Sequence, residues 1–118
     1  MDNKTRYRLE IVLGYVDRVA QTLDRAGSPE AFIADYDLQY SVAHSISQIA
    51  ELLTQVSHSD AVSFEQLLDV IPYRDIRRMR DKIQHHYGSI DSDTVWGIAS
   101  QNVPELGQAI KELMDAAS

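Results

Sequence analysis

The chain has 118 residues, no cysteine and a formal net charge of -7. This length predicts a single domain over residues 1–118, and the lack of cysteine excludes disulfides, thiolate metal sites and cysteine nucleophiles. The N-terminal segment "MDNKTRYRLE" has no apolar stretch like that of a signal peptide, and no apolar run reaches membrane-spanning length, so we expect a cytoplasmic protein without membrane association.

The first long helix is predicted over residues 5–26, because apolar side chains recur there every three or four positions and form one stripe. The stripe consists of Leu9, Val12, Leu13, Val16, Val19, Ala20 and Leu23. Gly27 is expected to end this helix. Ser28 and Pro29 follow as the cap and the first residue of another helical turn.

A second long helix is predicted after Asp37. Its stripe consists of Leu38, Val42, Ile46, Ile49, Leu52, Leu53 and Val56. The segment "SHSDAVS" (57–63) is expected to form a loop. Ser63 and Gln66 have the spacing of a capping box, so we expect a short helix, "FEQLLDV", to begin there and to end at Pro72.

A third long helix is predicted from about Tyr73 to Tyr87, where Gly88 ends it. Ser92 or Asp93 is expected to cap the next helix, which Pro104 kinks or restarts. The apolar residues of that helix are Val95, Trp96, Ile98, Leu106, Ile110, Leu113 and Met114. No segment alternates apolar and polar residues as a strand would. The predicted fold class is therefore all-α, a bundle of four or five helices.

Five of the eleven basic residues gather on the third helix, although the chain as a whole is acidic. They are Arg74, Arg77, Arg78, Arg80 and Lys82. At about 100° per residue, one face of this helix holds Arg74, Arg78, Asp81 and His85. Arg80 lies about 140° from His85, at the edge of the apolar stripe.

This arrangement indicates a phosphate-binding site with a group that titrates near neutral pH. Asp81 and His85 are four residues apart, so the carboxylate can orient the imidazole and favour its protonated form. A guanidinium at the edge of an apolar stripe, such as that of Arg80, needs a carboxylate or phosphate partner. The alternative is an ordinary basic face that is simply solvated.

The histidine pair His85-His86 does not have the spacing of a metal site. Adjacent side chains on a helix point about 100° apart, whereas helical zinc sites use histidines four residues apart. The five glycines are scattered and form no phosphate-binding loop. We therefore predict neither a metal site nor a cofactor.

Arg80, His85 and Tyr87 form an R-x4-H-x-Y motif that resembles the motif of HEPN domains. More closely, nearly the whole chain is similar to HepT-like proteins, the toxins of prokaryotic toxin–antitoxin pairs. The similar segments are "RYRLEIVLGYVDRV", "IAELL" and "IPYRDIRRMRDKIQHHYGSIDSDTVWGIASQNVPEL". The resemblance implies an up-and-down HEPN bundle that forms a homodimer through its motif helices, with one composite cleft made by two copies.

The resemblance also implies a metal-independent endoribonuclease that acts on RNA. His85 would be the general acid or base, and Arg80 would stabilise charge on the phosphate. Asp81, where HepT-like relatives often have asparagine, would orient His85. Its carboxylate is unfavourable beside RNA unless nearby arginines offset it. The candidate phosphate-binding residues are Arg74, Arg77 and Arg78.

In the systems that this chain resembles, a small nucleotidyltransferase acts as the antitoxin and transfers AMP to the motif tyrosine, which is Tyr87 here. The added phosphate would occupy the site beside Arg80 and His85 and repel RNA. Two other functions stay open. One is a non-catalytic HEPN module that binds nucleotide or docks the transferase, and the other is a structural dimer in which Arg80 pairs with a carboxylate such as Glu51.

Overall fold

The computed structural model describes residues 1–68, 73–85 and 91–117. Within 73–85 it describes the backbone throughout, but the side chains of Asp75, Met79, Ile83, Gln84 and His85 lie outside the description. The described residues form helices and no strand. The elements are α1 (Asn3–Ala26), α2 (Pro29–Ile33), α3 (Tyr36–Ser59), α4 (Ala61–Leu68), α5 (Tyr73–His85), α6 (Ser92–Gly97), the π-helical η1 (Ile98–Asn102) and α7 (Val103–Ala116).

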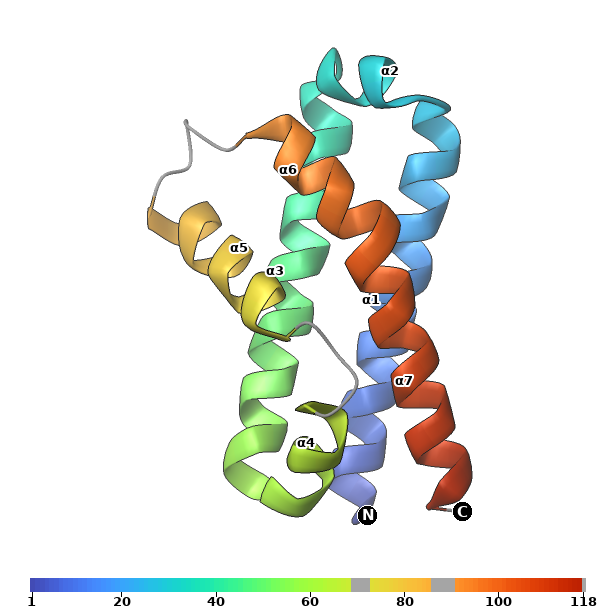
Figure 1. Cartoon of the computed structure of the whole chain (residues 1–118), viewed down its shortest axis with the longest axis vertical. Helices are drawn as coiled ribbons and strands as arrows, with labels where there is room; N and C mark the ends of the chain where they lie inside the picture. The colour runs from blue at the N-terminus through green and yellow to red at the C-terminus, as the bar shows by residue number, and fades with distance from the viewer. Residues whose placement is uncertain (69–72, 86–90, 118) are drawn as a thin grey trace.

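Four long helical rods run alternately up and down (Figure 1). They are α1, α3, α5 and the continuous rod made by α6, η1 and α7. The short helices α2 and α4 lie at opposite ends of the bundle, and α5 lies on one side, against α3. The predicted all-α, up-and-down bundle is confirmed. None of the described helices has both the length and the apolar character that crossing a membrane requires.

The core forms where the apolar stripes of the rods meet. Its fully buried side chains include Leu9, Val12, Ile46, Ile49, Leu53, Ile76, Leu106 and Ile110. Packing between α1 and α7 is especially close at Gly107, where an added Cβ would lie 2.8 Å from Val16 Cγ1. The helical spacing of apolar residues therefore identifies most of the buried positions, although Ala20 of the predicted first stripe is exposed.

Between α1 and α2, Gly27, Ser28 and Pro29 have the roles predicted from the sequence. Gly27 ends α1 with a φ of 82°, in the left-handed region that glycine adopts without steric cost. The Ser28 side chain then accepts a hydrogen bond of 3.1 Å from the backbone N–H of Ala31, and Pro29 is the first residue of α2.

The prediction of a loop over 57–63 is wrong. Helix α3 continues to Ser59, and Asp60 alone separates it from α4. Ser63 does not cap α4, because its backbone N–H and its hydroxyl both donate to the Asp60 carboxylate, at 3.2 and 2.9 Å. A single aspartate thus both ends one helix and caps the next, which leaves no need for a longer turn.

The last rod also differs from the prediction at two points. Asp91, rather than Ser92 or Asp93, caps α6, and its carboxylate accepts from the Asp93 N–H and the Thr94 hydroxyl. Pro104, which was predicted to kink or restart the helix, lies in the first turn of α7. The turn before it widens into η1, where the Val103 N–H donates to the Ile98 carbonyl five residues back. This π-helical turn accommodates a proline, which lacks an N–H and crowds the turn before it.

Asp2, Asp60 and Asp91 each cap a helix N-terminus, and the hydrogen bonds that these side chains accept favour the ionised carboxylate. Backbone donation from Thr5 lowers the pKa of Asp2, and donation from the Thr94 hydroxyl lowers the pKa of Asp91. Burial raises the pKa of Asp60, but the two hydrogen bonds from Ser63 outweigh it and hold this pKa below its ordinary value of 3.8. The three ionised carboxylates therefore stabilise the folded state fully above the ordinary aspartate pKa of 3.8. This stabilisation is lost as the pH falls through the lower pKa values of the folded state.

We expect Asp60→Ala to lower the free energy of unfolding by about 1 kcal/mol at pH 7, because α4 loses its N-cap. The difference from wild type should shrink at pH 3, where protonation weakens the wild-type cap as well. Asp60→Asn serves as the control and should lose less, since asparagine is also a good N-cap. Chemical denaturation at the two pH values measures both effects. An equal loss at pH 7 and pH 3 would contradict this role for the carboxylate.

Candidate active site

Helix α5 carries the motif residues that the structure describes, and its first turns are fixed to the bundle. Tyr73 is 7% exposed and Ile76 is fully buried, so both anchor α5 in the core. The Tyr73 hydroxyl makes a hydrogen bond of 2.8 Å with Thr54 Oγ1 on α3, and the Tyr73 ring meets Phe64 of α4 edge-on. These contacts fasten the first turns of α5 to α3 and α4.

Arg80 lies at the seam between α5 and α3. Its side chain is 20% exposed, and Nη2 donates a hydrogen bond of 3.0 Å to Oε2 of Glu51 on α3. Nη1 lies 3.6 Å from Oδ1 of Asp81, the next residue on α5. The Nε atom is buried and has no hydrogen-bond partner among the described residues. The prediction that Arg80 sits at the margin of the apolar stripe and needs a carboxylate partner is confirmed, and that partner is Glu51.

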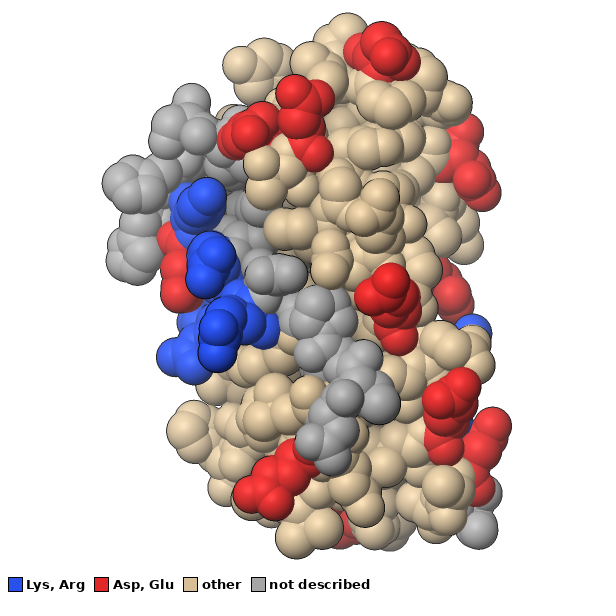
Figure 2. Space-filling model, viewed as in Figure 1, with Lys and Arg blue, Asp and Glu red and all other residues tan. Residues whose placement is uncertain are grey.

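The outer face of α5 is strongly basic. Arg74, Arg77, Arg78 and Lys82 are all exposed, as is Asp81. Figure 2 shows Lys and Arg atoms, in blue, gathered over α5 with an acidic group beside them, while the other acidic side chains are scattered over the rest of this view. Five cations and two acids give α5 a formal charge of +3, which leaves -10 for the rest of a chain with a total of -7. The charge segregation expected from the sequence is therefore a feature of the folded surface.

An open pocket of about 390 Å³ lies along this basic face. It is lined by Leu68, Tyr73, Arg74, Arg77, Arg78 and Asp81. The three arginines are the predicted phosphate-binding candidates, and the structure brings them together at one pocket. Leu68 and Tyr73 also line this pocket, and neither was predicted from the sequence as part of the site. The position of Tyr73, directly before the arginines on the apolar side of the helix, was the available signal.

The remaining predicted site residues are only partly described. The backbone of His85 forms the last residue of α5, but its side chain lies outside the described residues, as does Tyr87. The structure brings Arg80 next to Asp81 but does not place Arg80 among the residues that line the arginine pocket. Arg80 therefore faces α3, whereas Arg74, Arg77 and Arg78 face solvent.

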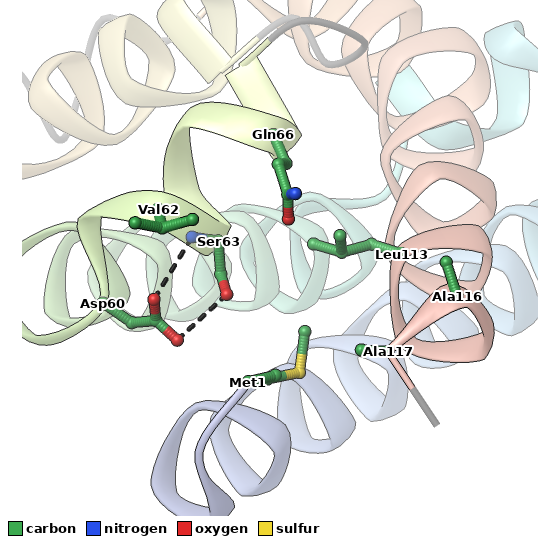
Figure 3. Close-up of a pocket in the computed structure, with 8 residues that line it drawn as sticks. All are labelled: Met1, Asp60, Val62, Ser63, Gln66, Leu113, Ala116 and Ala117. Atoms are coloured by element: carbon green, nitrogen blue, oxygen red, sulfur yellow. Dashed lines mark hydrogen bonds between the residues drawn. The ribbon is translucent and has the colours of Figure 1, made fainter.

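A second pocket, of about 310 Å³, lies where both ends of the chain meet α4 (Figure 3). Its lining residues are Met1, Asp60, Val62, Ser63, Gln66, Leu113, Ala116 and Ala117. Asp60 is the charged side chain in this set, and it is already bonded to Ser63. The pocket is therefore unsuited to an anion. Across the described parts of the chain, no three His, Cys, Asp or Glu side chains are arranged to hold a metal ion.

Comparison with known proteins places these features in a family. Residues 12–113 match the family model described as "Ribonuclease HepT-like". The chain is 29% identical to the "Probable ribonuclease HepT" of Thermococcus cleftensis, over 71% of this chain and 73% of that protein. It is 24% identical to the "Putative RNase MJ0125" of Methanocaldococcus jannaschii, over 87% and 84% of the two chains. No solved structure matches the chain significantly. The basic helix with its R-x4-H-x-Y motif lies within the matched residues, and this chain belongs to the HepT-like ribonuclease family.

Proposed function

We propose that the chain is a metal-independent endoribonuclease toxin with an active site that forms where the α5 helices of two copies meet. The proposal rests on the position of Arg80, a largely buried guanidinium on a helix of charge +3 in an acidic chain. Membership of a ribonuclease family supports the reaction class. The positive face of α5 supplies the charge that an RNA backbone requires.

The proposed chemistry uses the ribose next to the bond that breaks. His85 takes the proton from the 2′-hydroxyl, and the 2′-oxygen attacks the adjacent phosphorus. The bond from phosphorus to the 5′-oxygen then breaks, and a protonated imidazole donates a proton to the leaving oxygen. Arg80 stabilises the negative charge that builds on the phosphate oxygens. The products are a 2′,3′-cyclic phosphate and a 5′-hydroxyl, and each step uses only side chains and the RNA.

The geometry of α5 supports a shared site. Arg80 points to α3, and His85 lies about 140° away on an ideal helix. One copy alone therefore presents the two groups in different directions. A two-fold axis beside the α3–α5 seam, where 20% of the Arg80 side chain is exposed, would bring Arg80 of one copy toward His85 of the other.

Asp81 is proposed to orient His85, since the two are one helical turn apart. Its carboxylate is half exposed and lies 3.6 Å from Arg80, so it would also sit close to a bound phosphate. The exposed arginines on the same helix offset this unfavourable charge. Asp81 thus has a supporting role, and it takes no part in breaking the bond.

Arg74, Arg77 and Arg78 are proposed to bind RNA phosphates on either side of the scissile bond. Replacing each by alanine should weaken RNA binding and reduce the slope of log affinity against log salt by about 0.7, the value for one lost contact to a single strand. Arg18→Ala is the matched control, because Arg18 is an exposed arginine on α1 and stacks on Tyr15. Titration of a non-cleavable RNA at several salt concentrations measures the slope. If none of the three alanine substitutions on α5 changed this slope, the assignment of these arginines to RNA phosphates would be contradicted.

The toxin assignment predicts that induction of the chain arrests growth of its host and that His85→Ala does not. Co-expression with a nucleotidyltransferase encoded beside it should relieve the arrest and raise the mass of the protein by whole AMP units. Tyr87→Phe should stay toxic in the presence of the transferase, because it lacks the hydroxyl that accepts AMP. If the transferase relieved the growth arrest without adding mass to the protein, or relieved the arrest by Tyr87→Phe equally well, silencing through Tyr87 would be contradicted.

One observation favours a second candidate function, a structural dimer in which Arg80 pairs with a carboxylate of its own chain. Both terminal nitrogens of Arg80 already lie next to carboxylates, those of Glu51 and Asp81. A purely structural arginine would have such partners. Purified wild-type protein that folds and dimerises but cleaves no RNA would favour this function over the ribonuclease.

A further inference from the structure

Arg80 is held from outside its own helix. Its Nη2 donates to Glu51 on α3 at 3.0 Å, whereas its contact with Asp81 on α5 is longer, 3.6 Å. Glu51 is therefore the closer of the two carboxylates, and it belongs to a helix that is anchored in the core through Ile49 and Leu53. The direction of the guanidinium is set by a residue 29 positions earlier in the chain.

The burial of Arg80 makes this contact more important than a surface ion pair. Only 20% of the Arg80 side chain is exposed, and its Nε is buried without a hydrogen-bond partner among the described residues. A guanidinium with few alternative partners cannot easily rotate away from the carboxylate that it has. Glu51 itself is 46% exposed, so its second oxygen stays within reach of solvent.

We infer that Glu51 is a positioning residue that holds the Arg80 guanidinium at the α3–α5 seam in the orientation that phosphate stabilisation requires. This inference rests on the proposed ribonuclease function. Glu51 binds Nη2 and leaves the Nη1 side to the weaker, half-exposed Asp81. An incoming phosphate can displace Asp81 from that side while Glu51 keeps the side chain in place. Glu51 thus acts through Arg80 and does not touch the RNA.

The matched control is a second polar contact between the described residues of α3 and α5. Thr54 Oγ1 bonds the Tyr73 hydroxyl at 2.8 Å, so Thr54→Val removes a link between α3 and α5 at nearly constant volume without touching Arg80. If Glu51 only fastened α5 to α3, Glu51→Gln and Thr54→Val would affect cleavage alike. If Glu51 instead orients the Arg80 guanidinium, Glu51→Gln should lower kcat and Thr54→Val should not.

The experiment measures kcat and KM for RNA cleavage, together with the unfolding midpoint, for wild type, Glu51→Gln, Glu51→Ala and Thr54→Val. We expect kcat to fall about 10- to 100-fold in Glu51→Ala, as misplacement of a group that acts in the transition state does. Glu51→Gln should fall less, because it keeps an acceptor oxygen at the same reach. KM should change by less than about twofold in both, since phosphates bound along α5 supply the ground-state affinity. Thr54→Val should retain wild-type kcat.

An Arg80→Lys background separates positioning from a general structural effect. Adding Glu51→Ala to Arg80→Lys should cause little further loss, because the group that Glu51 positions is already gone. A similar loss in both backgrounds, or a kcat of Glu51→Ala equal to or above wild type, would overturn the inference. Wild-type protein without RNA cleavage would defeat the proposed function and this inference together, whereas an active wild type with unaffected Glu51 variants would defeat the inference alone.

Discussion

His85→Ala should lower the rate of RNA cleavage by roughly 10²- to 10⁴-fold, because it removes the general acid or base. Arg80→Ala should cause a loss of about 10²- to 10³-fold, the usual effect of losing a group that stabilises the transition-state charge. His85→Ala should lower the cleavage rate without a large change in stability, since Tyr73 and Ile76 anchor α5 at its other end. Arg80→Ala also removes the ion pair with Glu51, so its folded fraction must be measured beside its activity.

The chain offers a matched control for each substitution. His58 is an exposed histidine at the end of α3, and Arg18 is an exposed arginine on α1. Their alanine variants should cleave RNA at the wild-type rate. Circular dichroism and thermal unfolding identify any variant that is inactive because it is unfolded. A folded His85→Ala variant with wild-type activity would rule out the proposed role of the imidazole.

The second large effect is recovery of activity when two inactive variants are mixed. If each site takes Arg80 from one copy and His85 from the other, a heterodimer of the Arg80→Ala and His85→Ala chains contains one intact site. Random exchange of equal amounts should then restore about a quarter of wild-type activity, because half of the dimers are mixed and half of their sites are intact. The two variants should be unfolded and refolded together, or co-expressed, so that subunits exchange.

The outcome of mixing depends on where the two groups meet. A site built within one copy would gain nothing from exchange, because no chain in the mixture would carry both groups. The control is a mixture of two different His85 variants, which should stay inactive. A monomer at working concentration in light scattering, together with active wild-type enzyme, would contradict the shared site.

The sequence predicts those parts of the fold that depend on local chemistry. The end of α1 follows from a glycine that adopts a positive φ and from a Ser-Pro pair with a specific role in helix starts. The buried faces follow from the spacing of apolar residues, because each rod has a core on one side only. The basic outer face of α5 follows from the same spacing, since its apolar residues fix which side is exposed.

Other features depend on contacts that spacing does not reveal. The polar segment 57–63 resembles a loop, but Asp60 joins two helices directly because its carboxylate satisfies the first donors of α4. Pro104 resembles a helix break, but a single π-helical turn absorbs it within a continuous rod. At Asp60 a carboxylate, and before Pro104 a π-helical turn, allows helix to continue almost without interruption where composition alone predicts a loop or a break.

The candidate site was predicted in part. Helical geometry put Arg80 at the margin of the apolar stripe, and Glu51 was one carboxylate considered as its partner. The hydrogen bond between Tyr73 and Thr54 and the pocket beside the arginines depend on how α5 packs against α3 and α4, which helix periodicity does not specify. The side chain of His85 and all of Tyr87 lie outside the described residues, so their roles stay predictions.

If an imidazole and a guanidinium of this chain cleave RNA through the ribose 2′-hydroxyl, the reaction leaves characteristic groups at the new RNA ends. Purified protein should be incubated with RNA in excess EDTA, and the new ends should be identified by mass spectrometry. We expect 2′,3′-cyclic phosphates and 5′-hydroxyls from wild type and none from His85→Ala. Ends that carry 5′-phosphates, or cleavage that EDTA abolishes, would contradict it.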